Sequence, residues 1–166
     1  MIKKKVCMLG AFAVGKTSLV RRYVHGLFDE RYQTTVGVKV DRKAVPVDGR
    51  EVNLFLWDIH GEDDLQKVRP STLRGASGVL LVADGTRRPT LHTAEQLQQL
   101  AAEATGRELP FLLLVNKVDL RRDWEIGDAD LEELRGRGWT VLETSAKTGE
   151  VVEEAFETLA RRMVEP

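Results

Sequence analysis

Residues 10–17, with the sequence GAFAVGKT, decide the fold of this chain. They fit the pattern G-x-x-x-x-G-K-[ST], in which a glycine-rich loop wraps around phosphate groups. The glycines let the backbone approach closely enough for consecutive amide N–H groups to face phosphate oxygens. An apolar run precedes this loop at residues 6–9, and a helix-like segment follows it at residues 18–24. Because the positive end of that helix also favours anions, the sequence predicts a phosphate site here.

The two residues that end this phosphate loop have specific predicted roles. Lys16 is expected to reach the β- and γ-phosphates, and the Thr17 hydroxyl is expected to bind Mg²⁺. The alternative is a glycine-rich turn with a solvated lysine. Further nucleotide contacts are predicted for Ala13, Val14, Gly15 and Ser18.

Composition indicates an ordinary globular protein. The chain has 166 residues, 42% of them hydrophobic and 31% charged, which favours a single domain over residues 1–166 with a sizeable core. A net charge of -1 gives no sign of nucleic-acid binding. Cys7 is the only cysteine, so no internal disulfide forms, and buried filler is its expected role.

No segment predicts membrane insertion. The apolar runs are shorter than the roughly 18 residues of a membrane span, and the start of the chain does not fit a signal peptide. The last residues contain no cysteine for prenylation. We therefore expect a cytoplasmic protein without a direct membrane anchor.

Short apolar runs alternate with helical patterns along the chain. The dipeptide Asp48-Gly49 between two of the runs is a strong hairpin signal. This alternation predicts an α/β fold with a doubly wound, mostly parallel six-stranded sheet, one antiparallel edge strand and about five helices. Strands are expected at residues 2–9, 36–47, 51–58, 79–84, 111–116 and 140–144, and helices at 16–26, 91–104 and 152–163.

A second motif, Asn116-Lys-Val-Asp119, follows the apolar run 111–115. The carboxylate of Asp119 can accept hydrogen bonds from both N1–H and the exocyclic amine of guanine, whereas adenine has no such pair of donors. Lys117 can lie along the base plane, and Asn116 can link this segment to the phosphate loop. A polar loop that merely follows a strand is the alternative.

With these motifs the chain resembles the Ras-like small GTPases, and the Rab branch most closely, over essentially its whole length. The resemblance implies a P-loop G domain that binds GTP or GDP with Mg²⁺. The motifs on which it rests are residues 10–17, Thr34-Thr35-Val36-Gly37, Trp57-Asp58-x-x-Gly61, 116–119 and Ser145-Ala146-Lys147, with Rab-like stretches at 73–82 and 84–91.

The resemblance assigns roles around the phosphates. Thr35 would bind Mg²⁺ and the γ-phosphate from the first switch loop, Asp58 would hold Mg²⁺ through water, and the Gly61 amide would contact the γ-phosphate. An ordinary loop residue is the alternative for Thr35, and a strand-end cap is the alternative for Asp58. Tyr32 either covers the phosphates or is exposed. The implied catalytic residues are Lys16, Thr35, Gly61 and Glu62.

The resemblance also assigns residues around the base. Phe28 would pack its ring on the guanine, with an ordinary core role as the alternative. Ser145, Ala146 and Lys147 would line the other side of the base.

Residues just after the second switch aspartate depart from the family pattern. Glu62 replaces the glutamine that orients the attacking water. A carboxylate cannot donate a hydrogen bond to the γ-phosphate, and its charge is unfavourable beside a triphosphate. Hydrolysis then either falls or persists with Glu62 as a base. Ile59 and His60 replace small residues. His60 is expected to be an exposed loop residue, with assistance to proton transfer as the alternative.

Phe12 and Trp57 are predicted to affect protein partners. Phe12 stands where the family has a small residue facing the γ-phosphate, so its ring would obstruct an inserted arginine unless it folds against a switch loop. Trp57 is either an exposed partner contact or a partly buried structural ring. Val40 and Leu73 replace the other aromatics of the Rab partner-binding cluster.

We therefore predict a Mg²⁺-dependent molecular switch that hydrolyses GTP to GDP slowly. Effectors and regulators would bind through both switch loops and Trp57, and the chain would be monomeric. A pseudo-GTPase that holds nucleotide and acts as a scaffold is the alternative. An ATP-dependent kinase is disfavoured by Asp119.

Overall fold

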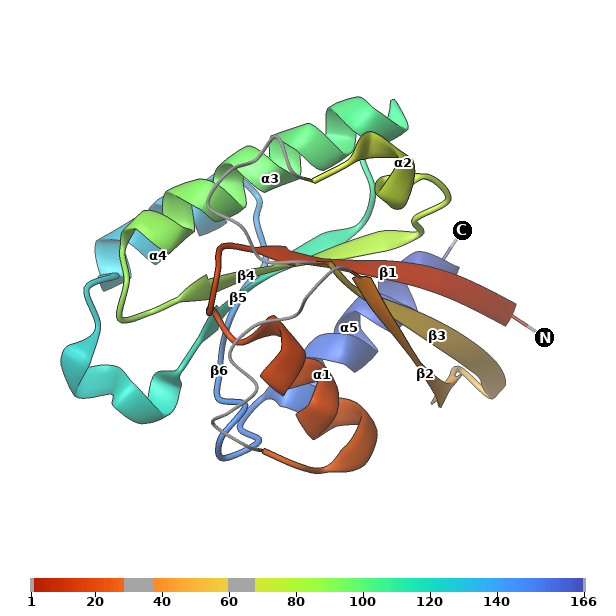
Figure 1. Cartoon of the computed structure of the whole chain (residues 1–166), viewed down its shortest axis with the longest axis horizontal. Coiled ribbons are helices and arrows are strands. Elements are labelled where there is room, and N and C mark those ends of the chain that lie inside the picture. The colour runs from red at the N-terminus through yellow and green to blue at the C-terminus, as the bar shows by residue number, and fades with distance from the viewer. Residues whose placement is uncertain (1, 29–37, 60–67, 166) are drawn as a thin grey trace.

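The computed structural model describes residues 2–28, 38–59 and 68–165. Its centre is a six-stranded sheet with the order β2-β3-β1-β4-β5-β6 and helices on both faces (Figure 1). Only β2 is antiparallel to its neighbour, and it lies at the sheet edge, so the predicted topology is confirmed. The strands are β1 Ile2–Gly10, β2 Val38–Val47, β3 Arg50–Ile59, β4 Gly78–Asp84, β5 Phe111–Asn116 and β6 Val141–Thr144.

Helices α1 and α5 cover one face of the sheet, and α3 and α4 cover the other (Figure 1). The helix ranges expected from the sequence include no counterpart of α2, α4 or the 3₁₀ segment after β5. The helices are α1 Lys16–His25, α2 Pro70–Leu73, α3 Pro89–Thr105, α4 Asp128–Gly136 and α5 Val152–Val164, with the 3₁₀ helix η2 at Val118–Asp123.

The β2–β3 hairpin turns at Asp48 and Gly49, as predicted. Both residues have positive φ, 49° and 77°, which is the backbone that an Asp-Gly turn adopts between tightly paired strands. Val47 pairs with Arg50 directly across the turn. The first residues of the predicted second strand, 36 and 37, lie outside the described residues.

Each central strand contributes side chains to two cores, because alternate residues point to opposite faces of a sheet. In β1, Val6 and Met8 belong to the core under α1 and α5, whereas Cys7 and Leu9 belong to the core under α3 and α4. Cys7 is fully buried, which confirms its predicted role as buried filler, and burial raises the pKa of its thiol to about 11.

Parallel pairing brings the carboxyl ends of four strands to one rim of the sheet. Asp84 at the end of β4 lies beside Asn116 at the end of β5, and Asn116 lies beside Thr144 at the end of β6. β1 ends next to them at Gly10, which pairs with Val82. The phosphate loop and the two predicted base-binding segments therefore start from neighbouring strand ends.

We predict that Phe156→Ala destabilises the fold strongly. Phe156 is buried and stacks on Tyr23, with ring centroids 4.1 Å apart and planes 2° apart. Removing the ring leaves a cavity, so the free energy of unfolding should fall by about 3–5 kcal/mol in urea titrations. Phe12→Ala is the matched control, because that ring is 45% exposed. Equal losses in the two variants would contradict this account of the core.

Candidate nucleotide-binding site

The phosphate loop connects β1 to α1 through a strained backbone. Gly15 has φ of 103°, and a Cβ there would overlap Nδ2 of Asn116. A Cβ on Gly10 would lie 2.6 Å from the carbonyl oxygen of Val82. Ala13 also has positive φ, 61°, which is uncommon for a residue with a side chain. The two glycines are thus needed for the close approach of this loop to its neighbours.

Asn116 links three segments of the site. Its Nδ2 donates to the carbonyl of Val14 at 3.1 Å. Its Oδ1 accepts from the Thr144 hydroxyl and from the Ala146 amide, both at 3.2 Å. The predicted link between the Asn116 segment and the phosphate loop is confirmed, and it also includes the segment after β6.

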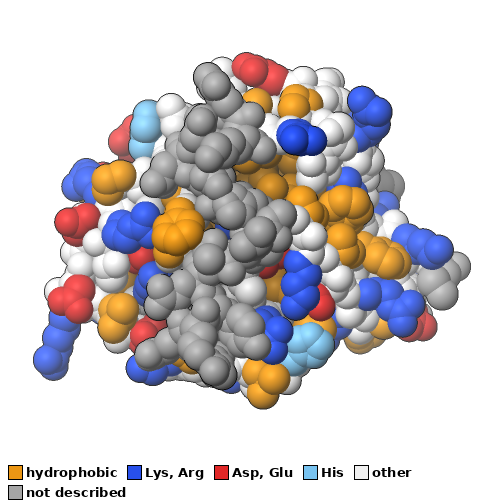
Figure 2. Space-filling view, in the orientation of Figure 1, with side chains coloured by type: hydrophobic (Ala, Val, Ile, Leu, Met, Phe, Trp, Pro, Cys, Tyr) orange, Lys and Arg blue, Asp and Glu red, His pale blue; other side chains and the backbone are white. Residues whose placement is uncertain are grey.

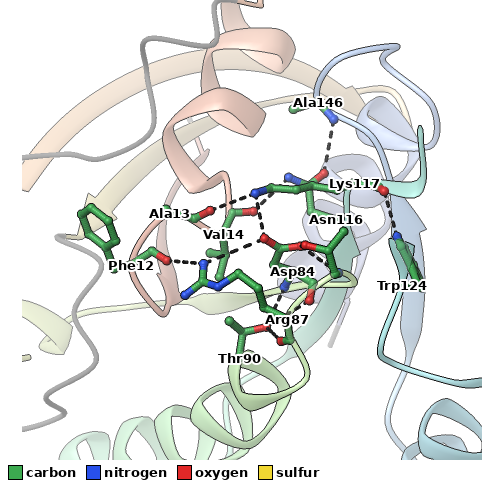
Figure 3. A network of polar contacts seen from close by, with 11 residues as sticks. Phe12, Ala13, Val14, Asp84, Arg87, Thr90, Asn116, Lys117, Trp124 and Ala146 are labelled. Carbon is green, nitrogen blue, oxygen red and sulfur yellow. Dashed lines mark hydrogen bonds and ion pairs between the residues drawn. The ribbon is translucent and has the colours of Figure 1, made fainter. Parts of the chain in front are cut away.

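The side chain of Lys117 contacts both the phosphate loop and the end of β4. Its Nζ donates to the carbonyl of Ala13 at 3.1 Å and lies 2.7 Å from Oδ2 of Asp84. The Lys117 backbone has φ of 77°, and Trp124 supports it by donating from Nε1 to the Lys117 carbonyl at 2.8 Å (Figure 3). Trp124 also packs against Gly85, where any Cβ would overlap the indole.

Asp84 is a site residue that the sequence reasoning missed. Its side chain is fully buried at the end of β4, and Oδ1 accepts from the Thr86 amide at 2.9 Å and from the Thr86 hydroxyl at 2.7 Å. Arg87 approaches Oδ2 at 3.9 Å and donates to the Phe12 carbonyl at 2.7 Å (Figure 3). A carboxylate that ends a continuous apolar strand was the signal that could have found it.

Lys16 is a buried cation at the start of α1, only 5% exposed. Burial lowers the pKa of Lys16, and the Asp58 carboxylate opposes that effect. A buried ammonium is favoured by nearby negative charge. The position at the end of the phosphate loop therefore suits an anion such as a polyphosphate.

Thr17 and Asp58 bring oxygen atoms together beside Lys16. The Thr17 hydroxyl donates to Oδ2 of Asp58 at 2.6 Å, and both side chains are buried. Hydroxyl and carboxylate oxygens are hard ligands of the kind that Mg²⁺ prefers. The donor set fits the predicted Mg²⁺ site, with Thr17 from α1 and Asp58 from β3.

One cavity adjoins the phosphate loop and both predicted base-binding segments. Asp119 contributes to its wall and accepts from the Ser145 hydroxyl at 2.7 Å. Phe28 lines the cavity and also packs against the core, so the core contact is present and its packing on guanine stays a prediction. The residues that line the cavity are Ala13, Gly15, Ser18, Phe28, Asn116, Lys117, Asp119, Leu120, Ala146 and Lys147.

Arg22 on α1 supports the segment after β6 and was also missed. Its Nε donates to the Ala146 carbonyl at 2.8 Å, and its terminal nitrogen donates to the Lys147 carbonyl. The helix that begins at the phosphate loop thereby holds the opposite wall of the cavity. Val14, predicted as a nucleotide contact, has a fully buried side chain, so only its backbone is available to a ligand.

Several predicted residues lie outside the described residues. They are Tyr32, Thr35, His60, Gly61 and Glu62. Ile59, just before them, is buried in the core under α3.

The residues around Trp57 differ in how far they are exposed. Leu73, which takes the place of one aromatic of the Rab cluster, is fully buried in the core under α3 and so adds nothing to an exposed surface there. Trp57 is half-buried against the same core, and Nζ of Lys5 lies 3.8 Å from the centroid of its ring. Val40 pairs with Trp57 across the strands and is exposed. The indole is therefore partly buried, as in the structural alternative, and its role as a partner contact stays a prediction.

The Phe12 ring points away from the charged contacts behind the loop. Its carbonyl faces Arg87, whereas the benzyl group is exposed on the other side (Figure 3).

Basic and acidic side chains are interspersed on the described surface of the face in Figure 2. Among the described residues, no helix is both long and apolar enough to cross a membrane.

Comparisons with known proteins agree with this geometry. Residues 5–165 match the Ras family. The chain is 33% identical over 162 residues to the Ras-related protein Rab-18-B of Danio rerio, an alignment that covers 97% of this chain and 79% of that relative. The chain therefore belongs to the Ras family of small GTPases, in its Rab-like branch.

Proposed function

We propose that the cavity holds GTP or GDP with Mg²⁺ and that the chain hydrolyses GTP slowly to GDP. The observation that supports this most is the set of contacts that Asn116 and Lys117 make with the phosphate loop. Through them a phosphate-binding backbone and the carboxylate of Asp119 border one cavity. A nucleoside polyphosphate would match this arrangement, with its phosphates on the loop backbone and its base beside the Asp119 carboxylate.

Each end of the nucleotide has its own set of residues. The loop amides and the ammonium of Lys16 would neutralise the phosphates, because a buried cation gains most from a charged partner. Asp119 would accept from both donors on the guanine edge. Phe28 and the segment Ser145-Ala146-Lys147 would flank the base, held in place by Asn116 and Arg22.

Thr17 and Asp58 are the proposed protein ligands of Mg²⁺, with Thr35 as a third from the first switch loop. The ion would offset the negative charge of the phosphates during transfer. The hydrogen bond between Thr17 and Asp58 keeps these oxygens together beside Lys16. Either side chain can then bind the ion directly or through water.

Hydrolysis would depend on Gly61 and Glu62. The Gly61 amide would contact the γ-phosphate, and Glu62 would accept a proton of the attacking water. A carboxylate gives no hydrogen bond to the γ-phosphate and repels it, so turnover would be slow. Loss of the γ-phosphate would release Thr35 and Gly61 and change the affinity of both switch loops for effectors.

Partner binding is proposed to centre on the switch loops and the exposed strand β2. Val38 and Val40 are exposed large apolar residues there, beside half-buried Trp57. We propose a monomeric, cytoplasmic protein whose effectors and regulators bind on this side and which binds no nucleic acid.

Asp119→Asn should remove the preference for guanine. An amide in place of the carboxylate leaves one guanine donor without an acceptor, so GDP affinity should fall by roughly 100-fold relative to ADP affinity. Competition of GDP and ADP against a fluorescent GDP measures the ratio. Asp123→Asn, an exposed carboxylate in the same 3₁₀ helix, is the control and should change nothing. An unchanged ratio in Asp119→Asn would refute the assignment of the base site.

Glu62→Gln should accelerate hydrolysis about tenfold, because glutamine can both orient the water and donate to the phosphate. Release of inorganic phosphate from pre-bound GTP in a single turnover measures the rate. Glu51→Gln, at an exposed position on β3, should behave as wild type. Wild-type protein that binds GTP but releases no phosphate would support the pseudo-GTPase alternative instead.

Phe12 should make the chain insensitive to activating proteins that insert an arginine. The exposed ring stands at the loop position next to the phosphates, so it reduces the space for a guanidinium. Phe12→Ala should raise activator-stimulated hydrolysis by about tenfold with little change in the rate without activator. Single-turnover assays with arginine-bearing activators, and with their arginine-to-alanine versions, measure this. Strong arginine-dependent stimulation of the wild-type chain would contradict the prediction.

A further inference from the structure

Three successive carbonyl groups of the phosphate loop accept hydrogen bonds from side chains of the sheet rim (Figure 3). The Phe12 carbonyl accepts from Arg87, at 2.7 Å. The next two, of Ala13 and Val14, accept from Lys117 and Asn116, each at 3.1 Å. The loop is therefore held from behind at three consecutive peptide groups.

These contacts determine where the loop amides point. In a trans peptide the carbonyl of one residue and the N–H of the next point in opposite directions, and the described residues contain no cis bond. Holding the Phe12 carbonyl toward Arg87 therefore directs the Ala13 N–H to the other side of the loop. Consecutive N–H groups aimed to one side are what binds an anion in such a loop.

Asp84 joins two of the three donors into one unit. Its buried Oδ2 lies 2.7 Å from the Lys117 ammonium and 3.9 Å from the Arg87 guanidinium. Its other oxygen is held by the amide and hydroxyl of Thr86. A buried carboxylate with two cationic neighbours fixes both side chains in position, since moving either one would leave charge less compensated.

The neighbouring arginine provides a comparison. Arg88 is 61% exposed at its side chain and pairs with Asp130 of α4, away from the phosphate loop. Arg87 is 39% exposed at its side chain and turns toward the loop. Of these two adjacent arginines before α3, Arg87 makes the contact with the Phe12 carbonyl, whereas Arg88 pairs with α4.

We infer that Arg87 is a positioning residue for phosphate binding, which directs the Ala13 amide by holding the Phe12 carbonyl, with Asp84 as its buried counter-ion. This inference rests on the proposed function, since it concerns the phosphates of the bound nucleotide. Arg87 touches the loop backbone from the side opposite the proposed ligand. It acts through the direction of a peptide group and not through direct contact with the phosphates.

Dissociation of a fluorescent GDP, displaced by excess unlabelled GDP in Mg²⁺ buffer, tests the inference. Arg87→Ala should speed dissociation about tenfold, the loss of one charge-assisted hydrogen bond. Arg87→Lys should restore part of that loss, because an ammonium can donate to the same carbonyl. Arg88→Ala is the matched control and should stay within about twofold of wild type. Equal rates for Arg87→Ala and Arg88→Ala would overturn the inference.

Two further measurements distinguish positioning from a general loss of structure. The ³¹P resonances of bound GDP should shift in Arg87→Ala and return toward wild type in Arg87→Lys. The preference for GDP over ADP should stay unchanged in Arg87→Ala, because the base site is untouched. A lost preference, or phosphate resonances that do not move, would count against the inference.

Asp84→Asn tests the counter-ion. It weakens the hold on both Arg87 and Lys117, so dissociation should be faster than in Arg87→Ala. Adding Arg87→Ala to Asp84→Asn should then have less effect than it has in the wild-type chain. Fully multiplicative effects would show that the two side chains act independently. Wild-type protein that binds no GDP would refute the proposed function itself, a result distinct from each of these.

Discussion

The rest of the site depends on the hydrogen bonds that the side-chain amide of Asn116 makes. This amide donates to the phosphate loop and accepts from Thr144 and from the Ala146 amide, so one buried group joins the ends of three strands. A side-chain amide is suited to this, because it offers donors and acceptors at once and carries no charge that burial would penalise. Gly15 leaves the space in which this amide lies.

Buried charge is the second constraint on the architecture. Asp84, Lys16 and Asp58 are almost fully buried, although isolated charges are costly to remove from water. Asp84 is offset by Lys117 and by hydrogen bonds from Thr86, and Lys16 has Asp58 nearby. A protein stabilised only by apolar packing would not need these groups. These buried charges lie together at one rim of the sheet. Burying them there costs folding free energy, and such perturbed charged groups are typical of a ligand-binding site.

Most of the fold was predictable because its signals are local. Continuous apolar runs identified the buried parallel strands, and Asp48-Gly49 identified the hairpin. Helix α4 was missed, since Leu131 and Leu134 are its only buried residues in a short and mostly charged segment. Whether Leu73 is exposed depends on how α2 packs on α3, which no local pattern encodes.

The sequence by itself determined the phosphate loop, the Asn116–Asp119 segment in which Asp119 is the predicted guanine contact, and the alternation of strands and helices along the chain. Those features follow from short motifs and from periodicity, whose physical causes act within a few residues. Only the tertiary structure decided which side chains hold the loop in shape. No motif assigned these contacts to Asp84, Arg87, Arg22 or Trp124, and the contacts join residues 7 to 125 positions apart. They become neighbours because parallel strands end at a common rim, a consequence of the sheet and not of any single segment.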